Sequence, residues 1–460
     1  MKFQSGGSLA AFGSGHAKKI CDAKFRPDSD SNFVTVGIKH VKFWSEDITY
    51  TGCVTGDVFI WKGGVLEKIV EKAHDGPIFS MHTCLHDGLI LTGAKQKRST
   101  QGASIKLWDQ QLSRARPFPV QSVGHQECYV IKSISRFKDK IIAGTKSCDL
   151  IEIQEQSGTP YFVLNSHGDG ALWGLAAHPK NDLVATASFD KTLRLWDVDK
   201  KVMLAKLELS QEAVSVAFSP EGALLAVGLK NGEIQIFHVS DLAPWGKRRD
   251  RNTSVNEIRF SPDGKTLVAA YDEGVADIYD ISKGPSFQRT TYCKSLGSSI
   301  YHLDFSTDSK YIKVSTMEYK TVVLNVKEAT EETEEKSLKQ IIWQTWTDVT
   351  SKEVRGIWPQ HSTQNEINCA DLSHMGRTLA TGDDSGFVKL FQFPCPDSKA
   401  EHRKYVGHSA HVTNVKFTFD DCHLVSTGGE DSCYKNRENV HKMKFNMERS
   451  YPPNASAPNP

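Results

Sequence analysis

An internal repeat of about 40 to 45 residues constrains the fold of this chain more than any other feature. The clearest copy begins at Ser166-His167, continues through LWGLAAHP and LVATASFD, and ends with LRLWD at Asp197. It contains three short segments rich in β-branched and aromatic residues, and turn residues separate them, which predicts consecutive antiparallel strands. Further copies open with PIFSMHT, IKSISRF, VSVAFSPEG, VNEIRFSPDG, IYHLDFSTDS, INCADLSHMG and VTNVKFTFDD.

The aromatic residue that closes the third strand of a copy sets the period. Trp108 and Trp196 lie 88 residues apart, which is two periods of 44, and Phe237 and Tyr279 follow after 41 and a further 42 residues. Helical repeats of this length would show apolar residues at a 3.6-residue spacing, and the copies lack it. The pattern therefore predicts an all-β fold made of WD40 β-propeller blades. Gly-His or a variant of it opens several copies, at His16, His74, His125, His167 and His408.

The repeats predict two WD40 propellers in tandem, of which the first is incomplete. We expect a partial N-terminal propeller over residues 1–160 and a C-terminal propeller over 161–432. Trp44 and Trp61 lie only 17 residues apart, where one period would separate them by about 40. About two strands are therefore missing there, so that either one blade is truncated or the chain is a shortened form of a longer template.

Two further irregularities fall in the second propeller. Residues 327–366 form an irregular insertion, with an acidic run over 327–336 that we expect to be a solvated loop. Its three tryptophans are expected to pack an irregular blade rather than form an exposed recognition face; they are Trp343, Trp346 and Trp358.

The last copy departs from the repeat after Asp431. Arg437 stands where an aromatic residue should close the third strand, and residues 433–460 are polar, rich in proline and aperiodic, so we expect a disordered tail. A propeller needs its last strand to close the ring and protect its edges. The terminal blade should therefore be damaged or completed by another segment.

Four residues of the clearest copy are predicted to form a buried structural network: His167, Thr186, Asp190 and Trp196. Each side chain can satisfy the hydrogen-bonding groups of a neighbour, so that the set can be buried together. Histidine, hydroxyl and carboxylate could also indicate a catalytic triad. Recurrence of the His-containing openings favours the structural interpretation.

A basic cluster follows Trp245 and is the candidate contact for a partner. It consists of Lys247, Arg248, Arg249 and Arg251, and we expect it in a loop between blades. The cluster is either an ordinary solvated loop or a contact for the acidic surface of a partner, whose attraction would weaken with salt.

Composition and motifs exclude several other functions. The 56 basic and 55 acidic residues nearly cancel, and no aromatic residues are interleaved with basic ones, so we expect binding to neither nucleic acid nor membranes. No apolar run approaches the roughly 20 residues of a membrane helix, and the N-terminus lacks a signal-peptide core. The ten cysteines form no C-x-x-C pair, and phosphate-binding or metal-binding motifs are absent. These features predict no catalytic residue, no cofactor and no metal.

The chain also resembles the echinoderm microtubule-associated protein-like family. The resemblance rests on FVTVGIKHVKFW at 33–44, DITYTGCVTGDVFIWKG at 47–63, W-x-x-W-T…G-I-W-P at 343–359, TGDDSGFVKLFQFPC at 381–395 and RKYVGHSAHVTNVKF at 403–417. It implies two tightly joined propellers that bind soluble tubulin, with microtubule attachment helped by an N-terminal coiled coil and basic region. It also implies that this chain begins inside the first propeller, without the family's hydrophobic N-terminal motif, first repeats or coiled coil.

Three functional hypotheses follow. The first is a non-catalytic scaffold of the cytoplasm and cytoskeleton that binds tubulin or microtubules and helps to organise them. The second is a generic WD40 adaptor in a signalling or ubiquitin-ligase complex, with the same architecture and a different partner. The third, an enzyme, would require titratable residues clustered in the central channel outside the recurring positions.

Overall fold

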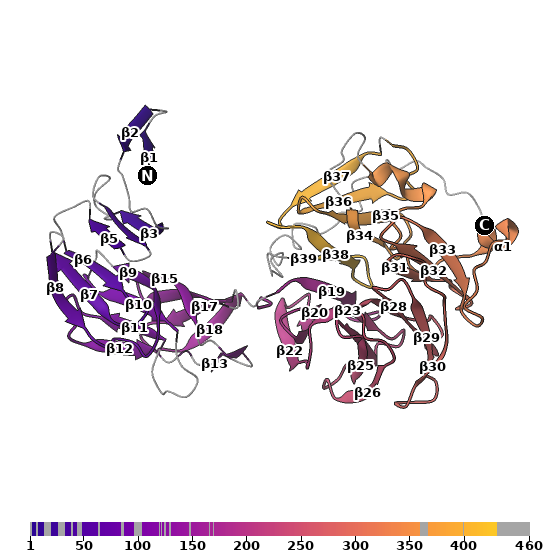
Figure 1. The fold of residues 1–460 in the computed structure, drawn as a ribbon, viewed down its shortest axis with the longest axis horizontal. Helices are drawn as coiled ribbons and strands as arrows, with labels where there is room; N and C mark the ends of the chain where they lie inside the picture. The colour runs from indigo at the N-terminus through magenta and orange to yellow at the C-terminus, as the bar shows by residue number, and fades with distance from the viewer. Residues whose placement is uncertain are drawn as a thin grey trace. The chain divides into compact units, whose positions relative to one another are not determined.

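The computed structural model describes residues 48–429, except for gaps at 63–64, 84–86, 96–103, 119, 121, 124–125, 128–129, 147–148, 165, 169, 359–366 and 399. Before residue 48, and at 122–123, 126–127 and 164, it describes only the backbone of strands. The chain divides into two compact units, Met1–Leu164 (unit 1) and Asn165–Pro460 (unit 2) (Figure 1). The domain limits inferred from the repeats stay a prediction.

Unit 2 contains six antiparallel sheets among its described residues, which we call blades A to F. Blade A consists of β19 (Leu172–Ala177), β20 (Leu183–Ser188), β21 (Thr192–Asp197) and β22 (Val202–Glu208); blade B of β23 (Ala213–Phe218), β24 (Leu224–Leu229), β25 (Glu233–His238) and β26 (Pro244–Arg249); and blade C of β27 (Val255–Phe260), β28 (Thr266–Tyr271), β29 (Ala276–Asp280) and β30 (Gln288–Tyr292). Blade D consists of β31 (Ile300–Phe305), β32 (Tyr311–Thr316) and β33 (Thr321–Asn325); blade E of β34 (Ile367–Leu372), β35 (Thr378–Asp383), β36 (Phe387–Gln392) and β37 (His402–Val406); and blade F of β38 (Val412–Phe417) and β39 (Leu424–Gly428).

Burial differs between the strands of a blade in the way that blade stacking requires. In the second strands β20, β24 and β28, every residue after the first is buried. These strands pack against blades on both sides, so both of their faces carry apolar or small residues. The outermost strands β22 and β30 contain no fully buried residue, and β30 alternates between more and less exposed residues, because only one face of an outermost strand packs on a neighbour.

A hydroxyl side chain organises the turn between the first two strands of most blades. Ser219 and Ser261 accept hydrogen bonds from the backbone N–H groups of Leu224 and Thr266 through their Oγ atoms, at 3.0 and 2.9 Å. The fourth residue of the SPDG turn, Gly264, has φ of 70°, a left-handed conformation that suits glycine. The turn sequences SPEG and SPDG are therefore structural, as their proline and glycine residues indicate.

The innermost strands all carry a β-bulge at the same place, after their first residue. A bulge bends the strand and changes the direction of the following side chains. The inner strands β19, β23, β27 and β31 pack in this order, β34 packs against β38, and β38 packs against β19. The blades therefore follow one another around an axis, which confirms the predicted propeller fold (Figure 1).

Blade F closes the ring against blade A. Thr413 donates a hydrogen bond through Oγ1 to the carbonyl of Leu172 on β19. Val425 of blade F packs in one buried cluster with Val184 and Trp196 of blade A. Within the described residues, blade F has only β38 and β39. Arg437 and the tail predicted from residue 433 lie outside the described residues.

The insertion fills the space between blades D and E. Glu331 bridges to Leu324 of β33, and the short helix α1 (Glu335–Gln340) follows, with its residues largely exposed. Trp343 then bridges to Ser306 beside β31. A 3₁₀-helix (Lys352–Ile357) continues the insertion, whose residues 359–366 lie outside the described residues.

The tryptophans of the insertion are half-buried and pack as predicted. Trp346 contacts Phe393 edge to face with ring centroids 5.0 Å apart, and its Nε1 donates to the Asp348 carbonyl. Trp358 donates to the Val349 carbonyl at 2.7 Å and belongs with Trp346 to the apolar cluster beneath blade E. These side chains therefore attach the insertion to the propeller.

Unit 1 contains two four-stranded sheets, formed by β9 (Ile78–Thr83), β10 (Ile90–Ala94), β11 (Ile105–Trp108) and β12 (Ala115–Phe118), and by β15 (Ile131–Phe137), β16 (Lys140–Thr145), β17 (Leu150–Gln154) and β18 (Pro160–Leu164). Two sheets have three described strands: β3 (Ile20–Phe25), β4 (Phe33–Gly37) and β5 (His40–Phe43), and β6 (Ile48–Gly52), β7 (Val58–Lys62) and β8 (Val65–Val70). Two-stranded pairs are formed by β1 (Lys2–Ser5) and β2 (Ser8–Phe12), and by β13 (Ser122–Val123) and β14 (Gln126–Glu127).

The short interval between Trp44 and Trp61 has a direct structural counterpart. Strand β5 ends at Phe43 as the third strand of its sheet, and β6 begins at Ile48 in the next sheet. Each of these sheets has three strands among those described, in agreement with the expectation that about two strands are missing. His16, Trp44 and His125 lie outside the described residues.

Candidate interaction surface and central channel

The four residues predicted to form a structural network come together in blade A. His167 Nε2 lies 2.7 Å from Thr186 Oγ1, and Trp196 Nε1 donates to the same hydroxyl at 2.7 Å. His167 Nδ1 lies 3.0 Å from Asp190 Oδ2. His167, Thr186 and Trp196 are fully buried, so that the network satisfies polar groups inside the blade and presents no reactive group to solvent.

Arg194 is a fifth member of this network that the repeat pattern does not reveal. Its Nη1 donates to the Ser166 carbonyl at 2.6 Å, and its Nη2 lies 3.2 Å from Asp190 Oδ2. Burial and the positive charge of Arg194 lower the pKa of His167 to about 4, although Asp190 opposes the shift. The imidazole is therefore neutral at pH 7, and the buried charges are those of Arg194 and Asp190.

Similar contacts recur in other blades. In unit 1, His74 Nε2 lies 2.7 Å from Thr92 Oγ1, to which Trp108 Nε1 donates at 2.9 Å. In blade F, His408 Nε2 lies 2.9 Å from Ser426 Oγ. The histidine–hydroxyl pair recurs at the same place in several repeats, whereas a catalytic group is needed only once. The pair therefore has a structural role in the fold.

The buried histidines predict a loss of stability in weak acid. Burial lowers the pKa values of His167 and His302 from 6.5 to about 4. Between these values the unfolded chain binds more protons, so the stabilisation is complete above pH 6.5 and is lost as the pH falls towards 4. We expect the free energy of unfolding to fall by about 2 kcal/mol between pH 7.5 and pH 5 through His167, and by less through His302, which faces a cavity.

Urea unfolding at the two pH values measures this loss. Charged groups near His167 are Asp190, Arg194 and Lys206, and those near His302 are Asp304, Asp348, Arg259 and Lys416. His302→Gln should reduce the pH dependence, whereas His402→Gln on the exposed strand β37 should leave it unchanged. Equal stability of the wild-type chain at pH 7.5 and pH 5 would contradict the expectation.

Three of the four residues of the basic cluster lie on a strand, so the predicted loop position is wrong for them, whereas Arg251 lies between β26 and β27 as predicted. Lys247, Arg248 and Arg249 are the last residues of β26, the outermost strand of blade B. Lys247 pairs in register with Gln235 of β25, and Arg249 with Glu233. The alternation of a strand then sends Lys247 and Arg249 to one face and Arg248 to the other.

Only part of the cluster is available to a partner. Arg248 makes two hydrogen bonds to Asp250, at 2.8 and 2.9 Å. Arg251 makes two hydrogen bonds of 2.8 Å to the buried Asp277, so both arginines stabilise the blade. Lys247 and Arg249 are exposed, and they provide the outward positive charge of this edge.

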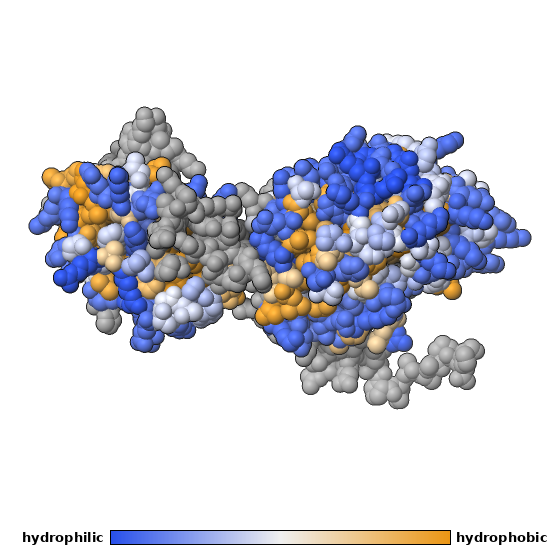
Figure 2. Space-filling model, turned by 90° about the horizontal axis from the view of Figure 1, so that it is seen from below, coloured by the Kyte–Doolittle hydropathy of each residue, from blue (hydrophilic) through white to orange (hydrophobic). Residues whose placement is uncertain are grey.

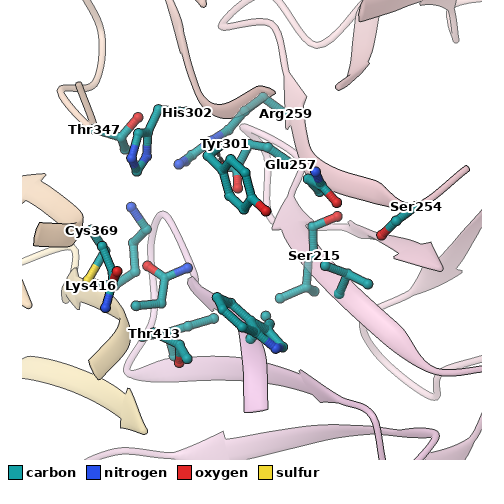
Figure 3. A pocket seen from close by; sticks show the side chains of 18 of the residues that line it. Ser215, Ser254, Glu257, Arg259, Tyr301, His302, Thr347, Cys369, Thr413 and Lys416 are labelled. Carbon is teal, nitrogen blue, oxygen red and sulfur yellow. Dashed lines mark ion pairs between the residues drawn. The ribbon is translucent and has the colours of Figure 1, made fainter. Parts of the chain in front are cut away.

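A cavity of about 260 Å³ lies where the six inner strands converge. Thr347 of the insertion also lines it, near His302 (Figure 3). The side chains are unevenly distributed around the channel. The fifth residue of the inner strand is alanine in blades A and B and is charged in the other four, where Arg259, Asp304, Asp371 and Lys416 occupy this position.

These charges are compensated by neighbouring groups. Arg259 Nε lies 2.7 Å from Glu257 Oε1, and Lys416 Nζ lies 2.6 Å from Asp371 Oδ1. Asp304 accepts hydrogen bonds from Thr345 Oγ1 at 2.7 Å and from the Thr347 amide at 3.0 Å. Lys416 and Asp371 join blades F and E, and Asp304 holds the insertion, whereas Arg259 and Glu257 pair within the single strand β27. We interpret all three contacts as structural.

A titratable cluster in the channel is a feature that would favour an enzyme, yet its groups are poorly suited to catalysis. Burial raises the pKa of the Cys369 thiol to about 12, and burial lowers the pKa of His302 to about 4. At pH 7 the thiol is therefore protonated, whereas a nucleophilic cysteine needs a thiolate. Among the described residues no hydrogen bond joins Cys369 to a base that could activate it.

The repeated blades, their inner bulges and the histidine–hydroxyl–tryptophan networks define this chain as a WD40-type β-propeller protein. Residues 172–435 match the family model described as the echinoderm microtubule-associated protein second beta-propeller. This match covers more than half of the chain, and the chain belongs to the echinoderm microtubule-associated protein family.

Curated relatives match nearly the whole chain. The 77 kDa echinoderm microtubule-associated protein of Lytechinus variegatus is 28% identical over 90% of this chain and 68% of its own length. Echinoderm microtubule-associated protein-like 4 of Xenopus tropicalis is 28% identical over 96% of the chain and 51% of its own length. Echinoderm microtubule-associated protein-like 2 of Mus musculus is 28% identical over 89% of the chain and 66% of its own length. The chain thus spans about half to two thirds of the length of these relatives.

Proposed function

We propose that this chain is a non-catalytic propeller scaffold that binds tubulin or microtubules and takes part in organising the microtubule cytoskeleton. The observation that carries the proposal is the similarity of about nine tenths of the chain to proteins that are named as microtubule-associated. The cytoplasm and the cytoskeleton are accordingly its proposed location. No helix in the described part of the chain has the length and apolar character to cross a membrane.

The surface of unit 2 is compatible with a partner that is recognised through polar groups. Hydrophilic residues cover most of unit 2 on the face seen in Figure 2, and apolar residues form smaller patches. A largely polar surface favours recognition through complementary charges and hydrogen bonds. Lys247 and Arg249 at the edge of blade B would then attract an acidic partner surface.

The proposal assigns no reaction to the central channel. Its cations and carboxylates are paired with one another, and its cysteine is a protonated thiol at pH 7. Electrostatic pairing of this kind neutralises buried charges without activating a nucleophile, and the Lys416–Asp371 pair also joins two blades. We therefore propose that the channel is a structural part of the scaffold.

Co-sedimentation of the purified chain with microtubules, together with size-exclusion chromatography in the presence of soluble tubulin, tests the function. We expect binding in at least one assay at low salt, and weaker binding as the salt concentration rises. The double variant Lys247→Glu, Arg249→Glu should raise the dissociation constant by about tenfold, because it reverses two outward charges.

The matched control is Arg403→Glu, Lys404→Glu, which makes the same charge change on the exposed outer strand β37 of blade E. If both double variants weaken tubulin or microtubule binding equally, the effect is one of overall charge, and β26 is not the contact for the partner. Absence of both interactions at low salt would contradict tubulin or microtubule binding by this chain. Proximity labelling that recovers signalling or ubiquitin-ligase components in place of tubulin would support the adaptor hypothesis.

A further inference from the structure

Three potential metal ligands meet where blade F closes the ring against blade A. Asp182 lies in the turn between β19 and β20, and Asp420 and His423 lie in the turn between β38 and β39. One carboxylate oxygen of each aspartate and one ring nitrogen of His423 lie within 4.8 Å of one another. The ligands therefore come from the first and the last blade of unit 2.

Two atoms of this cluster are buried without a partner. His423 is 7% exposed, and its Nδ1 has no hydrogen-bond partner. Oδ1 of Asp182 is also buried and without a hydrogen bond. A buried polar atom that makes no hydrogen bond is costly, and its presence calls for an explanation such as an ion or a water molecule.

The charges of the cluster also lack compensation among the described residues. Neither Asp182 nor Asp420 forms an ion pair there, and the two carboxylates face each other. Other turns at this end of the ring contact each other directly. Lys180 pairs with Glu221 between blades A and B, and the His374 amide donates to Asp421 between blades E and F.

The local turn explains only one of the three residues. Asp420 Oδ1 accepts hydrogen bonds from Thr418 Oγ1 at 2.7 Å and from the Cys422 amide at 3.0 Å. Asp263 makes the equivalent contact with Ser261 in blade C, so this bond is a feature of the repeat. It leaves the second oxygen of Asp420 available, and it does not account for Asp182 or His423.

We propose that Asp182, Asp420 and His423 bind a divalent transition-metal ion of the Zn²⁺ type, which joins blade F to blade A. An imidazole with two carboxylates suits such ions, whereas Mg²⁺ and Ca²⁺ prefer oxygen ligands alone. Zinc binds histidine and carboxylate at about 2.0 to 2.2 Å, so a small inward movement of the three side chains would bring them onto one ion. A water molecule would complete the coordination.

The ion should stabilise the closure of the ring, because its ligands lie 238 residues apart, from Asp182 to Asp420. Binding to the folded chain alone shifts the folding equilibrium towards the folded state. We therefore expect Zn²⁺ to raise the Tm of the EDTA-treated full chain by several degrees, whereas Mg²⁺ at the same concentration leaves it unchanged.

The variant Asp182→Asn gives the sharpest test, because its effect should depend on the metal. In EDTA the Tm should stay the same or rise, since the substitution removes a carboxylate that faces Asp420 and breaks no hydrogen bond of Oδ1. In Zn²⁺ the rise in Tm should disappear. Isothermal titration of the full chain should show at least tenfold weaker binding of one Zn²⁺ equivalent than in the wild type.

Two further variants complete the experiment. His423→Gln should also abolish the Zn²⁺-dependent rise in Tm, and circular dichroism establishes that each variant is folded. Asp263→Asn is the matched control, since it removes the same turn contact in blade C, and it should keep the full response to Zn²⁺. The proposal is overturned if Zn²⁺ does not change the wild-type Tm, or if Asp182→Asn binds Zn²⁺ as the wild type does. It is equally overturned if Asp263→Asn loses the response to the same extent.

Discussion

Replacing Trp196 with alanine should destabilise unit 2 by about 3 to 5 kcal/mol. The indole is fully buried and packs with Leu175, Val184 and Val425 between blades A and F. Alanine would leave a cavity at the closure of the ring, and it would also remove the hydrogen bond from Nε1 to Thr186. Urea unfolding of the full chain, followed by far-ultraviolet circular dichroism, measures the effect.

Two variants separate this effect from a general loss of tryptophan. Trp196→Phe keeps much of the buried volume and should cost clearly less than alanine. Trp108→Ala removes the corresponding residue of unit 1, which donates to Thr92, and it should leave the unfolding of unit 2 unchanged. A cost below about 1 kcal/mol for Trp196→Ala would show that the residue does not hold the blades together.

Asp304→Ala should cost a similar amount, about 3 to 5 kcal/mol, because it breaks a buried charged network. Asp304 is 1% exposed and accepts hydrogen bonds from Thr345 Oγ1 and the Thr347 amide. Its carboxylate also lies 3.8 Å from Lys313 Nζ, which is buried against the Trp346 ring. The variant leaves a buried amide unpaired and weakens the compensation of Lys313, so that the insertion should detach from blade D.

Limited proteolysis combined with urea unfolding measures this second effect. Cleavage should accelerate within residues 342–358, where the insertion depends on Asp304. The control Asp308→Ala removes a carboxylate that accepts from Ser306 Oγ in a turn of the same blade, and it should cost about 1 kcal/mol. Equal effects of the two substitutions would contradict a special role for Asp304.

The fold was largely predictable because the same local rules recur in every copy. Turns such as SPDG at 261–264 mark strand ends, and residues such as Trp196 set the period, so that the all-β WD40 propeller class was inferred correctly. The position of the basic cluster was not inferred correctly. Lys247, Arg248 and Arg249 lack the apolar alternation of a strand, because β26 is outermost and takes its place from pairing with β25.

The charged residues of the channel can be recognised in the sequence only when the inner strands are aligned with one another. Arg259, Asp304, Asp371 and Lys416 share the fifth position of the inner strand, which holds alanine in blades A and B. Lys313 likewise interrupts an apolar strand, IKVST, beside the insertion.

The candidate metal ligands cannot be recognised in the sequence in this way. Asp182 is far from Asp420 and His423 in the sequence, and only closure of the ring brings them together. Motif spacing detects ligands that lie on one element, whereas these lie on turns of two blades. The three-dimensional arrangement was therefore needed to find them.

Hydrogen exchange of the full chain, measured by mass spectrometry with and without saturating tubulin dimer, tests the proposed scaffold function most directly. We expect slower exchange in a surface segment of the propeller that includes residues 244–251, while the buried strand β28 exchanges at the same rate in both samples. Unchanged exchange throughout the chain at saturating tubulin would contradict the function proposed for this protein.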